Sequence, residues 1–143
     1  MNQRKITIIN GPNLNLTGKR EPDKYGRLSF EEWLPEIKLQ YPCFDIEYFQ
    51  SNIEGEIINK LQQVGFSAHG IILNPGGYTH TSVSIADTVA ALTTPVVEVH
   101  LSQILAREPF RQVSIVSAQC KGIIAGFGLD SYRLALEFFM KML

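Results

Sequence analysis

Short apolar runs alternate along the chain with longer stretches in which apolar residues recur every three or four positions. Runs without polar alternation, typical of strands buried on both faces, occupy residues 5–10, 70–73, 96–100 and 123–127. Residues 44–50 alternate apolar with polar side chains and predict a strand nearer a sheet edge. Residues 113–117 could pass for another strand, but they lie too close to 123–127 for a helix between them, so we expect them to be irregular.

Helical periodicity fills the intervals between these strands. The first helix begins after Ser29, because Ser29 and Glu32 have the spacing of a capping box. Pro35 either bends this helix or marks the start of its regular part. The second helix has a cap at Ser51 or Asn52, and its apolar face comprises Ile53, Ile57, Ile58, Leu61 and Val64, with Gly65 as its stop. Two more helices are expected at residues 82–92 and 132–143.

This alternation of strands and helices predicts an α/β fold with a parallel sheet. The length fits a single domain, residues 1–143, with a three-layer, flavodoxin-like arrangement around five strands. Ligands of such sheets bind beyond the carboxyl ends of the strands. The segments after the first, third and fourth strands, residues 10–26, 74–82 and 101–111, hold most of the unusual polar residues. We therefore expect them to meet at one site.

Composition and charge exclude several classes of protein. The chain is 45% apolar and 19% charged, with a formal net charge of −1, so it has no electrostatic footprint for nucleic acid or an anionic membrane. Its amino terminus lacks the features of a signal peptide, and its apolar runs fall short of the ~20 residues that cross a bilayer. Cys43 and Cys120 have no CxxC partner, and we expect both to be reduced and buried as small apolar side chains. The expected location is the cytoplasm.

The segment of residues 10–26, NGPNLNLTGKREPDKYG, is too long for an ordinary connection. Its Gly11 and Gly18-Lys19 resemble a phosphate-binding loop superficially, but the spacing is too long and no hydroxyl residue follows the lysine. Arg20 and Tyr25 suggest different chemistry. A cation about 4 Å from a phenol would lower its pKa and supply a base at neutral pH. The alternative for Tyr25 is an aromatic side chain that only packs over a neighbour.

The fourth strand ends in a second candidate group. Glu98, His100 and Ser102 are two residues apart and would share one face of a strand, where the carboxylate would orient the imidazole as a general acid. A buried, hydrogen-bonded core histidine is the alternative. A metal site made by His80, His100 and Glu98 has acceptable ligands but no recognisable spacing.

Polar residues of the third-strand and fourth-strand loops allow two interpretations each. Asn74, His80 and the hydroxyls near them could bind a polyhydroxy compound, or this loop could be a tight turn into a helix cap at Ser82. Arg107 and Arg111 could hold a carboxylate or hydroxyls, or form surface ion pairs with Glu108.

Taken together, these residues resemble the type II 3-dehydroquinate dehydratases from end to end. The blocks that carry the resemblance are NGPNLNLTGKREPDKYG, QSNIEGEI, ILNPGGYTHTSVSIAD, PVVEVHLSQILAREPFR and GIIAGFGLDSYRLAL. The resemblance implies a flavodoxin-like fold, trimers assembled into dodecamers, and no metal, cofactor or Schiff-base lysine. It also implies anti elimination of water from 3-dehydroquinate through an enolate, in either shikimate biosynthesis or quinate breakdown.

The same resemblance assigns roles to individual residues. It implies that Tyr25 is the base, activated by Arg20 in a lid loop of about residues 18–27, and that His100 is the proton donor, oriented by Glu98. Asn13 would hold water and stabilise the enolate. The substrate-binding residues that it implies are Asn74, Leu101 and Ser102 for the carboxylate, His80 and Arg111 for the ring hydroxyls, and Asp87 for a neighbouring subunit's site.

Three departures from the family's usual residues accompany these matches. Ala86 replaces a common arginine, Thr17 replaces a leucine, and Ser131 replaces a glycine before Tyr132. The first puts an ion pair between subunits in doubt, and the last bears on the start of the final helix. A binding module without catalysis and a metal-assisted lyase or hydrolase are the competing functions. The intact set of Tyr25, Arg20 and His100 argues against the first of these, because binding alone needs no acid and base.

Overall fold

The computed structural model describes residues 3–19 and 28–143 of the chain. Its five strands form one parallel sheet in the order β2-β1-β3-β4-β5, which is the flavodoxin-like order. The strands are β1 (Arg4–Asn10), β2 (Phe44–Gln50), β3 (Gly70–Asn74), β4 (Val96–His100) and β5 (Gly122–Ala125). The predicted α/β fold, the parallel sheet and the edge position of residues 44–50 are therefore confirmed.

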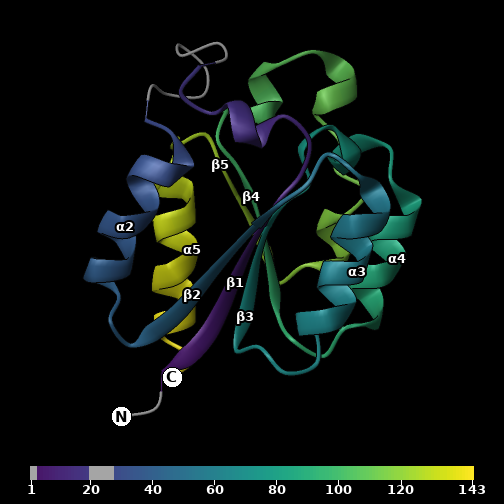
Figure 1. Cartoon of the computed structure of the whole chain (residues 1–143). Helices are drawn as coiled ribbons and strands as arrows, with labels where there is room; N and C mark the ends of the chain where they lie inside the picture. Colours follow the sequence, from purple (N-terminus) through teal and green to yellow (C-terminus); the bar gives the residue numbers. More distant parts are fainter. Residues whose placement is uncertain (1–2, 20–27) are drawn as a thin grey trace.

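Four α-helices in the described part of the chain cover the two faces of the sheet. They are α2 (Phe30–Gln40), α3 (Glu54–Val64), α4 (Val83–Ala91) and α5 (Asp130–Met140). Figure 1 shows α2 and α5 on one face and α3 and α4 on the other, with the sheet between them. Each face has its own apolar core, and the interior strand β1 contributes to both, because Ile6 and Ile8 face α2 and α5 while Ile9 faces α3 and α4.

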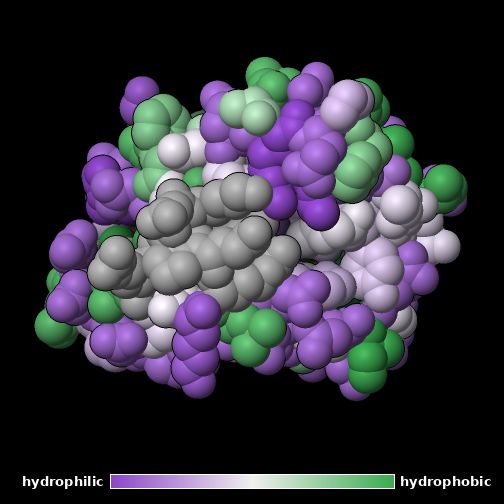
Figure 2. All heavy atoms as spheres, turned by 90° about the horizontal axis from the view of Figure 1, so that it is seen from above, coloured by the Kyte–Doolittle hydropathy of each residue, from purple (hydrophilic) through white to green (hydrophobic). Residues whose placement is uncertain are grey.

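Short 3-10 helices occupy the connections that follow the strands. They are η1 (Leu14–Leu16), η2 (Gly76–His80), η3 (Ile104–Ala106), η4 (Pro109–Arg111) and η5 (Ser117–Gln119). Four of them, η1 to η4, follow the carboxyl ends of β1, β3 and β4, at the upper end of the molecule in Figure 1. Figure 2 looks onto this end and shows hydrophilic side chains gathered there. Irregular segments with many polar side chains therefore cover this edge of the sheet.

The first helix follows the sequence prediction at its start. The Ser29 side chain accepts from the backbone N–H of Glu32, and the Glu32 side chain accepts from the backbone N–H of Ser29, so the capping box is present. The helix begins at Phe30 and continues through Pro35. The alternative in which its regular part starts near Pro35 is therefore wrong.

The cap predicted for the second helix is wrong. The N-cap of α3 is Ile53, which uses no side-chain cap and is 58% exposed, so it lies outside the apolar face. The Ser51 hydroxyl instead accepts from Ile53 N–H and donates to Glu56, while the Asn52 carbonyl accepts from the loop after β1. Ile57, Leu61 and Val64 are buried and Ile58 is half-buried, as predicted, and the helix ends before Gly65.

Element ends near the carboxyl terminus differ by a few residues from the prediction. The strand predicted at 123–127 is Gly122–Ala125, because Gly126 adopts a φ of 100° and turns the chain out of the sheet. Helix α5 begins at Asp130, and the Ser131 hydroxyl accepts from the backbone N–H of Phe127. The cap at Ser82 and the irregular course of residues 113–117 are confirmed.

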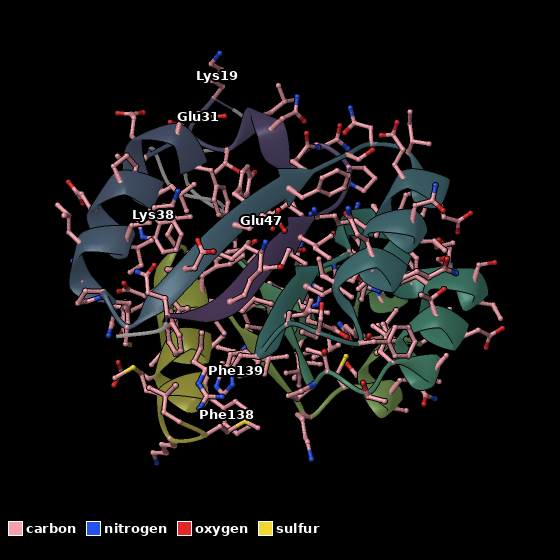
Figure 3. The ribbon with its side chains drawn as sticks, turned by 60° about the horizontal axis from the view of Figure 1, so that its bottom comes forward. Lys19, Glu31, Lys38, Glu47, Phe138 and Phe139 are labelled. Atoms are coloured by element: carbon pink, nitrogen blue, oxygen red, sulfur yellow. The ribbon has the colours of Figure 1, made fainter. Side chains whose placement is uncertain are left out.

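Charged side chains occupy the exposed edge of the sheet. Glu47 lies on β2 (Figure 3), and its carboxylate is 3.1 Å from Lys60 Nζ and 3.7 Å from Lys5 Nζ. Burial raises the pKa of Glu47, but the Lys60 and Lys5 ammonium groups outweigh it and the net pKa lies below its usual value. Charges on an edge strand disfavour pairing with another chain.

None of the helices among residues 3–19 and 28–143 is long and apolar enough to cross a membrane. Cys43 and Cys120 are free thiols and half-buried. Burial, followed by the charge of Glu98, raises the pKa of Cys120 to about 12, so this thiol stays protonated at neutral pH.

The two cores give a direct stability prediction. Leu61 is 0% exposed under α3, whereas Leu39 on α2 is 83% exposed. Leu61→Ala should lower the free energy of unfolding by about 2–5 kcal/mol through lost burial and a cavity, while Leu39→Ala should change it by less than about 0.5 kcal/mol. Denaturant titration of both variants measures this difference, and equal losses would contradict the assignment of the core.

Candidate active site

A cavity of about 150 Å³ opens at the carboxyl ends of β1, β3 and β4. Its lining comes from three segments: Pro12, Asn13 and Leu14; Asn74, Gly76, Gly77 and His80; and His100, Leu101, Ser102, Ile104, Arg107 and Arg111. These are the loops that the sequence predicts to converge. The convergence is therefore confirmed, and it follows from the parallel sheet, which places the ends of these strands at one edge.

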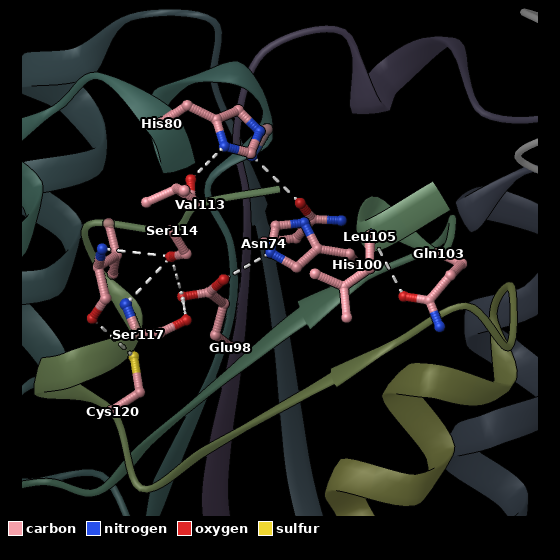
Figure 4. Close-up of polar contacts among 12 residues, drawn as sticks. Asn74, His80, Glu98, His100, Gln103, Leu105, Val113, Ser114, Ser117 and Cys120 are labelled. Carbon is pink, nitrogen blue, oxygen red and sulfur yellow. Dashed lines mark hydrogen bonds and ion pairs between the residues drawn. The ribbon is translucent and has the colours of Figure 1, made fainter. Parts of the chain in front are cut away.

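Glu98 and His100 form a buried pair on β4. Both side chains point to the α3 and α4 side of the sheet, and His100 Nε2 lies 2.6 Å from Glu98 Oε2 (Figure 4). Glu98 is 0% exposed and His100 is 6% exposed, yet His100 also lines the cavity. A carboxylate accepts, so Nε2 carries the hydrogen and Nδ1 is the ring nitrogen left for exchange of a proton. The predicted alignment holds for these two residues, but β4 ends at His100, so Ser102 is not part of it.

Two serines that the sequence analysis did not identify complete the surroundings of Glu98. The hydroxyls of Ser114 and Ser117 each donate to Glu98 Oε1 at 2.9 Å. They belong to residues 113–117, whose apolar pattern resembles that of a strand, so their role is not evident from the sequence. The only sequence signal is two hydroxyl residues three positions apart in an otherwise apolar segment.

Asn74 is held by a chain of buried hydrogen bonds. Its Nδ2 donates to Tyr132 Oη at 2.9 Å, and Tyr132 in turn donates to Asn10 Oδ1 at 2.7 Å. The Asn74 Oδ1 accepts from the backbone N–H of Gly76 at 3.1 Å. Burial raises the pKa of Tyr132 far above its usual value, although hydrogen bonds with Asn74 and Asn10 oppose the shift, so the phenol remains a donor. This network fixes the side chain of Asn74 and the turn behind it.

The first loop reaches the cavity by close backbone contact. Gly11 N–H donates to the carbonyl of Asn74 at 2.7 Å, and a Cβ at Gly11 would overlap the carbonyl of Pro75. Asn13 follows with a φ of 70°, and its backbone N–H donates to Asn52 Oδ1 at 3.0 Å. Glycine at position 11 and the Asn52 contact thus place Asn13 in the lining.

His80 is oriented by the backbone of a distant segment. Its Nδ1 lies 2.7 Å from the carbonyl oxygen of Val113. Because a carbonyl only accepts, Nδ1 carries the hydrogen, and Nε2 is available to accept from a hydroxyl. His80 can therefore bind a hydroxyl while the turn of Gly76 and Gly77 forms the neighbouring wall.

Two arginines make one wall of the cavity positive. Arg107 Nη1 donates to Ser102 Oγ at 3.4 Å, and Arg111 Nε lies 3.1 Å from Glu108 Oε2. Glu108 also lies 3.9 Å from Arg107 Nε. A hydrogen bond from its own backbone N–H and the Arg111 guanidinium lower the pKa of Glu108. The predicted ion pairs with Glu108 are confirmed, and both arginines also line the cavity, whereas their binding of a carboxylate or hydroxyls stays a prediction.

The remaining predicted site residues are not all in this cavity. Leu101 lines it, whereas Asp87 is exposed on α4 and does not. Arg20 and Tyr25 lie outside the described residues. Ala86 is only 8% exposed and packs in the core beneath α4.

The described residues give no support to the metal-site alternative. No three histidine, cysteine or acidic side chains among residues 3–19 and 28–143 gather as metal ligands would. Glu98 already accepts from His100, Ser114 and Ser117. The cavity instead combines an acid–base histidine, amide and hydroxyl groups, and guanidinium groups, which suit a small hydroxylated anion.

Comparison with known proteins gives a consistent result over the whole chain. The Dehydroquinase class II family matches residues 4–140. The 3-dehydroquinate dehydratase of Caldicellulosiruptor bescii is 49% identical over 136 residues, which cover 93% of this chain and 94% of that protein. The corresponding protein of Chlorobaculum tepidum is 46% identical over 141 residues, covering 96% and 94%.

Solved structures agree with the sequence comparison. The type II dehydroquinase from Butyrivibrio crossotus superposes with a TM-score of 0.91 at 40% identity, covering 96% of this chain and 97% of that chain. The type II dehydroquinase from Propionibacterium acnes gives 0.90 at 36% identity, covering 95% of each. With this fold, this cavity and these relatives, the chain belongs to the class II dehydroquinase family of hydro-lyases.

Proposed function

We propose that the residues of this cavity catalyse the dehydration of 3-dehydroquinate to 3-dehydroshikimate by anti elimination through an enolate. The observation that carries the proposal is the buried Glu98–His100 pair, which faces a cavity built from three strand-end loops. The relatives named above as 3-dehydroquinate dehydratases support the choice of substrate.

The reaction needs a base and an acid on different parts of the substrate. Tyr25, activated by the neighbouring guanidinium of Arg20, takes the proton from the carbon next to the ketone, and the electron pair moves to the ketone oxygen as an enolate. Collapse of the enolate expels the hydroxyl group, which leaves as water with a proton from His100. Glu98 orients the imidazole and stabilises the positive charge of the protonated imidazole that donates this proton.

Backbone amides, an asparagine amide, a histidine and an arginine bind the remaining groups. The substrate carboxylate meets the backbone N–H groups of Leu101 and Ser102 and the amide of Asn74, none of which can lose a proton at neutral pH. His80 and Arg111 bind the ring hydroxyls. Asn13 holds the water molecule that stabilises the enolate oxygen.

We also propose that the lid of about residues 18–27 closes over bound substrate and delivers Tyr25 to it. The active assembly is a dodecamer built from trimers, in which Asp87 reaches the site of a neighbouring subunit. The exposed position of Asp87, outside its own chain's cavity, supports this arrangement.

The base assignment gives the first test of function. Tyr25→Phe removes one hydroxyl and should lower kcat by at least about 100-fold while the protein remains folded, because a positioned base contributes that much. Tyr41→Phe is the matched control, since its hydroxyl bonds Glu137 away from the cavity, and it should keep the activity of the parent. Product formation measured at saturating substrate decides between them. A fully active Tyr25→Phe enzyme would rule out Tyr25 as the base.

The contribution of Asp87 to a neighbouring site can be tested by mixing two impaired chains. Asp87→Ala and Tyr25→Phe should each lower activity alone. When the two variants are co-expressed and assemble randomly into trimers, about a quarter of the sites should combine an intact Tyr25 with an intact Asp87 and be active. Recovery occurs because a chain with Tyr25 meets a neighbour with Asp87. Activity equal to the average of the two separate variants would contradict the arrangement, and light scattering measures whether the mixture is a dodecamer.

A further inference from the structure

Residues 113–117 connect both histidines of the site, although they form no strand and only Ser117 belongs to a helix, η5. The Val113 carbonyl accepts from His80 Nδ1 at 2.7 Å, and Ile115 N–H donates to the Thr79 carbonyl at 3.0 Å. In the same segment, the hydroxyls of Ser114 and Ser117 reach Glu98 (Figure 4). One short segment therefore fixes the position of the loop after β3 relative to the Glu98–His100 pair on β4.

The hydrogen of the Ser114 hydroxyl has a single direction open to it. Ser114 Oγ accepts from the backbone N–H groups of Val116 at 3.2 Å and Ser117 at 3.1 Å. A hydroxyl has two acceptor lone pairs and one hydrogen, so with both lone pairs used the hydrogen must point to Glu98 Oε1, 2.9 Å away. The backbone of the segment thus fixes the orientation of this donor.

Ser117 adds a second donor to the same carboxylate oxygen. Its hydroxyl lies 2.9 Å from Glu98 Oε1, while Oε2 is left to His100 at 2.6 Å. A carboxylate held at one oxygen by two hydroxyls cannot rotate without leaving these half-buried donors unsatisfied. The serines therefore determine which oxygen faces the imidazole and at what angle.

We propose that Ser114 and Ser117 are positioning residues that fix the Glu98 carboxylate and, through it, the ring of His100. This inference rests on the proposed role of His100 as the proton donor and extends it to residues that do not touch the cavity. A serine that only capped the turn at η5 would bond backbone groups alone. Ser114 does accept from two backbone N–H groups, but its hydroxyl and that of Ser117 also converge on Glu98 Oε1.

The test compares kcat, KM and the tautomer of His100 in serine variants. Ser114→Ala and Ser117→Ala should each lower kcat about tenfold, as loss of a charge-assisted hydrogen bond does, and leave KM within about twofold. In ¹⁵N NMR spectra the neutral His100 ring should be the Nε2–H form in the parent and a mixture of both tautomers when both serines are alanine.

Thr94→Val is the matched control, because it removes a buried hydroxyl that donates to the Ala68 carbonyl just before β4, at the opposite end of that strand. It should lower stability without changing kcat or the His100 spectrum. Introduced into a Glu98→Ala background, the serine substitutions should have no further effect on kcat, because the residues act in series.

The outcomes separate this inference from the proposed function. If Glu98→Ala lowers kcat but the serine variants match the control in kcat and in tautomer, the positioning role is wrong and the acid assignment stands. If Glu98→Ala keeps the full kcat, the positioning role of the serines is wrong, and so is the proposed role of Glu98 in orienting His100. If Glu98→Ala does not fold, the tautomer measurement on the serine variants alone decides.

Discussion

Burial of one carboxylate, Glu98, is the constraint on which the site depends. A carboxylate taken out of water costs several kcal/mol unless donors surround it. Here a ring N–H and two hydroxyls meet its two oxygens, and each charge-assisted bond contributes about 1.5–3 kcal/mol. These bonds require the end of β4 and residues 113–117 to lie together. The same segment also bonds His80, so the requirements of one buried side chain fix the positions of both histidines that line the cavity.

A second constraint brings the first loop to the same place. The parallel sheet sets the ends of β1 and β3 side by side, with Asn10 opposite Asn74. Only a residue without a side chain fits at Gly11, because the chain passes directly against the backbone at Pro75. The Tyr132 hydroxyl forms hydrogen bonds with both asparagines, so a residue of the last helix stabilises loops that are far from it in sequence. The cavity is therefore rigid where its walls are backbone and buried polar groups.

Two rules predict much of this arrangement: the periodicity of strands and helices, and the binding of ligands beyond the carboxyl ends of parallel strands. Tertiary contacts decide the rest. The alignment of Glu98 with His100 follows from the two-residue repeat of a strand, and the convergence of three loops follows from the parallel sheet. Ser114 and Ser117 escape prediction because an irregular segment has no period from which to infer direction. The cap at α3 fails for a similar reason, since Asn52 is drawn to the first loop and cannot cap the helix.

The most direct test of the account is turnover of 3-dehydroquinate by the purified protein. The product contains a conjugated enone, whose ultraviolet absorbance should rise on mixing. Because Tyr25 and His100 are proposed to perform the elimination alone, the rate should be unchanged with a chelator present and after treatment with borohydride, which inactivates enzymes that act through a Schiff base. No rise in absorbance, or a rate that is lost after chelation or borohydride, would contradict the account.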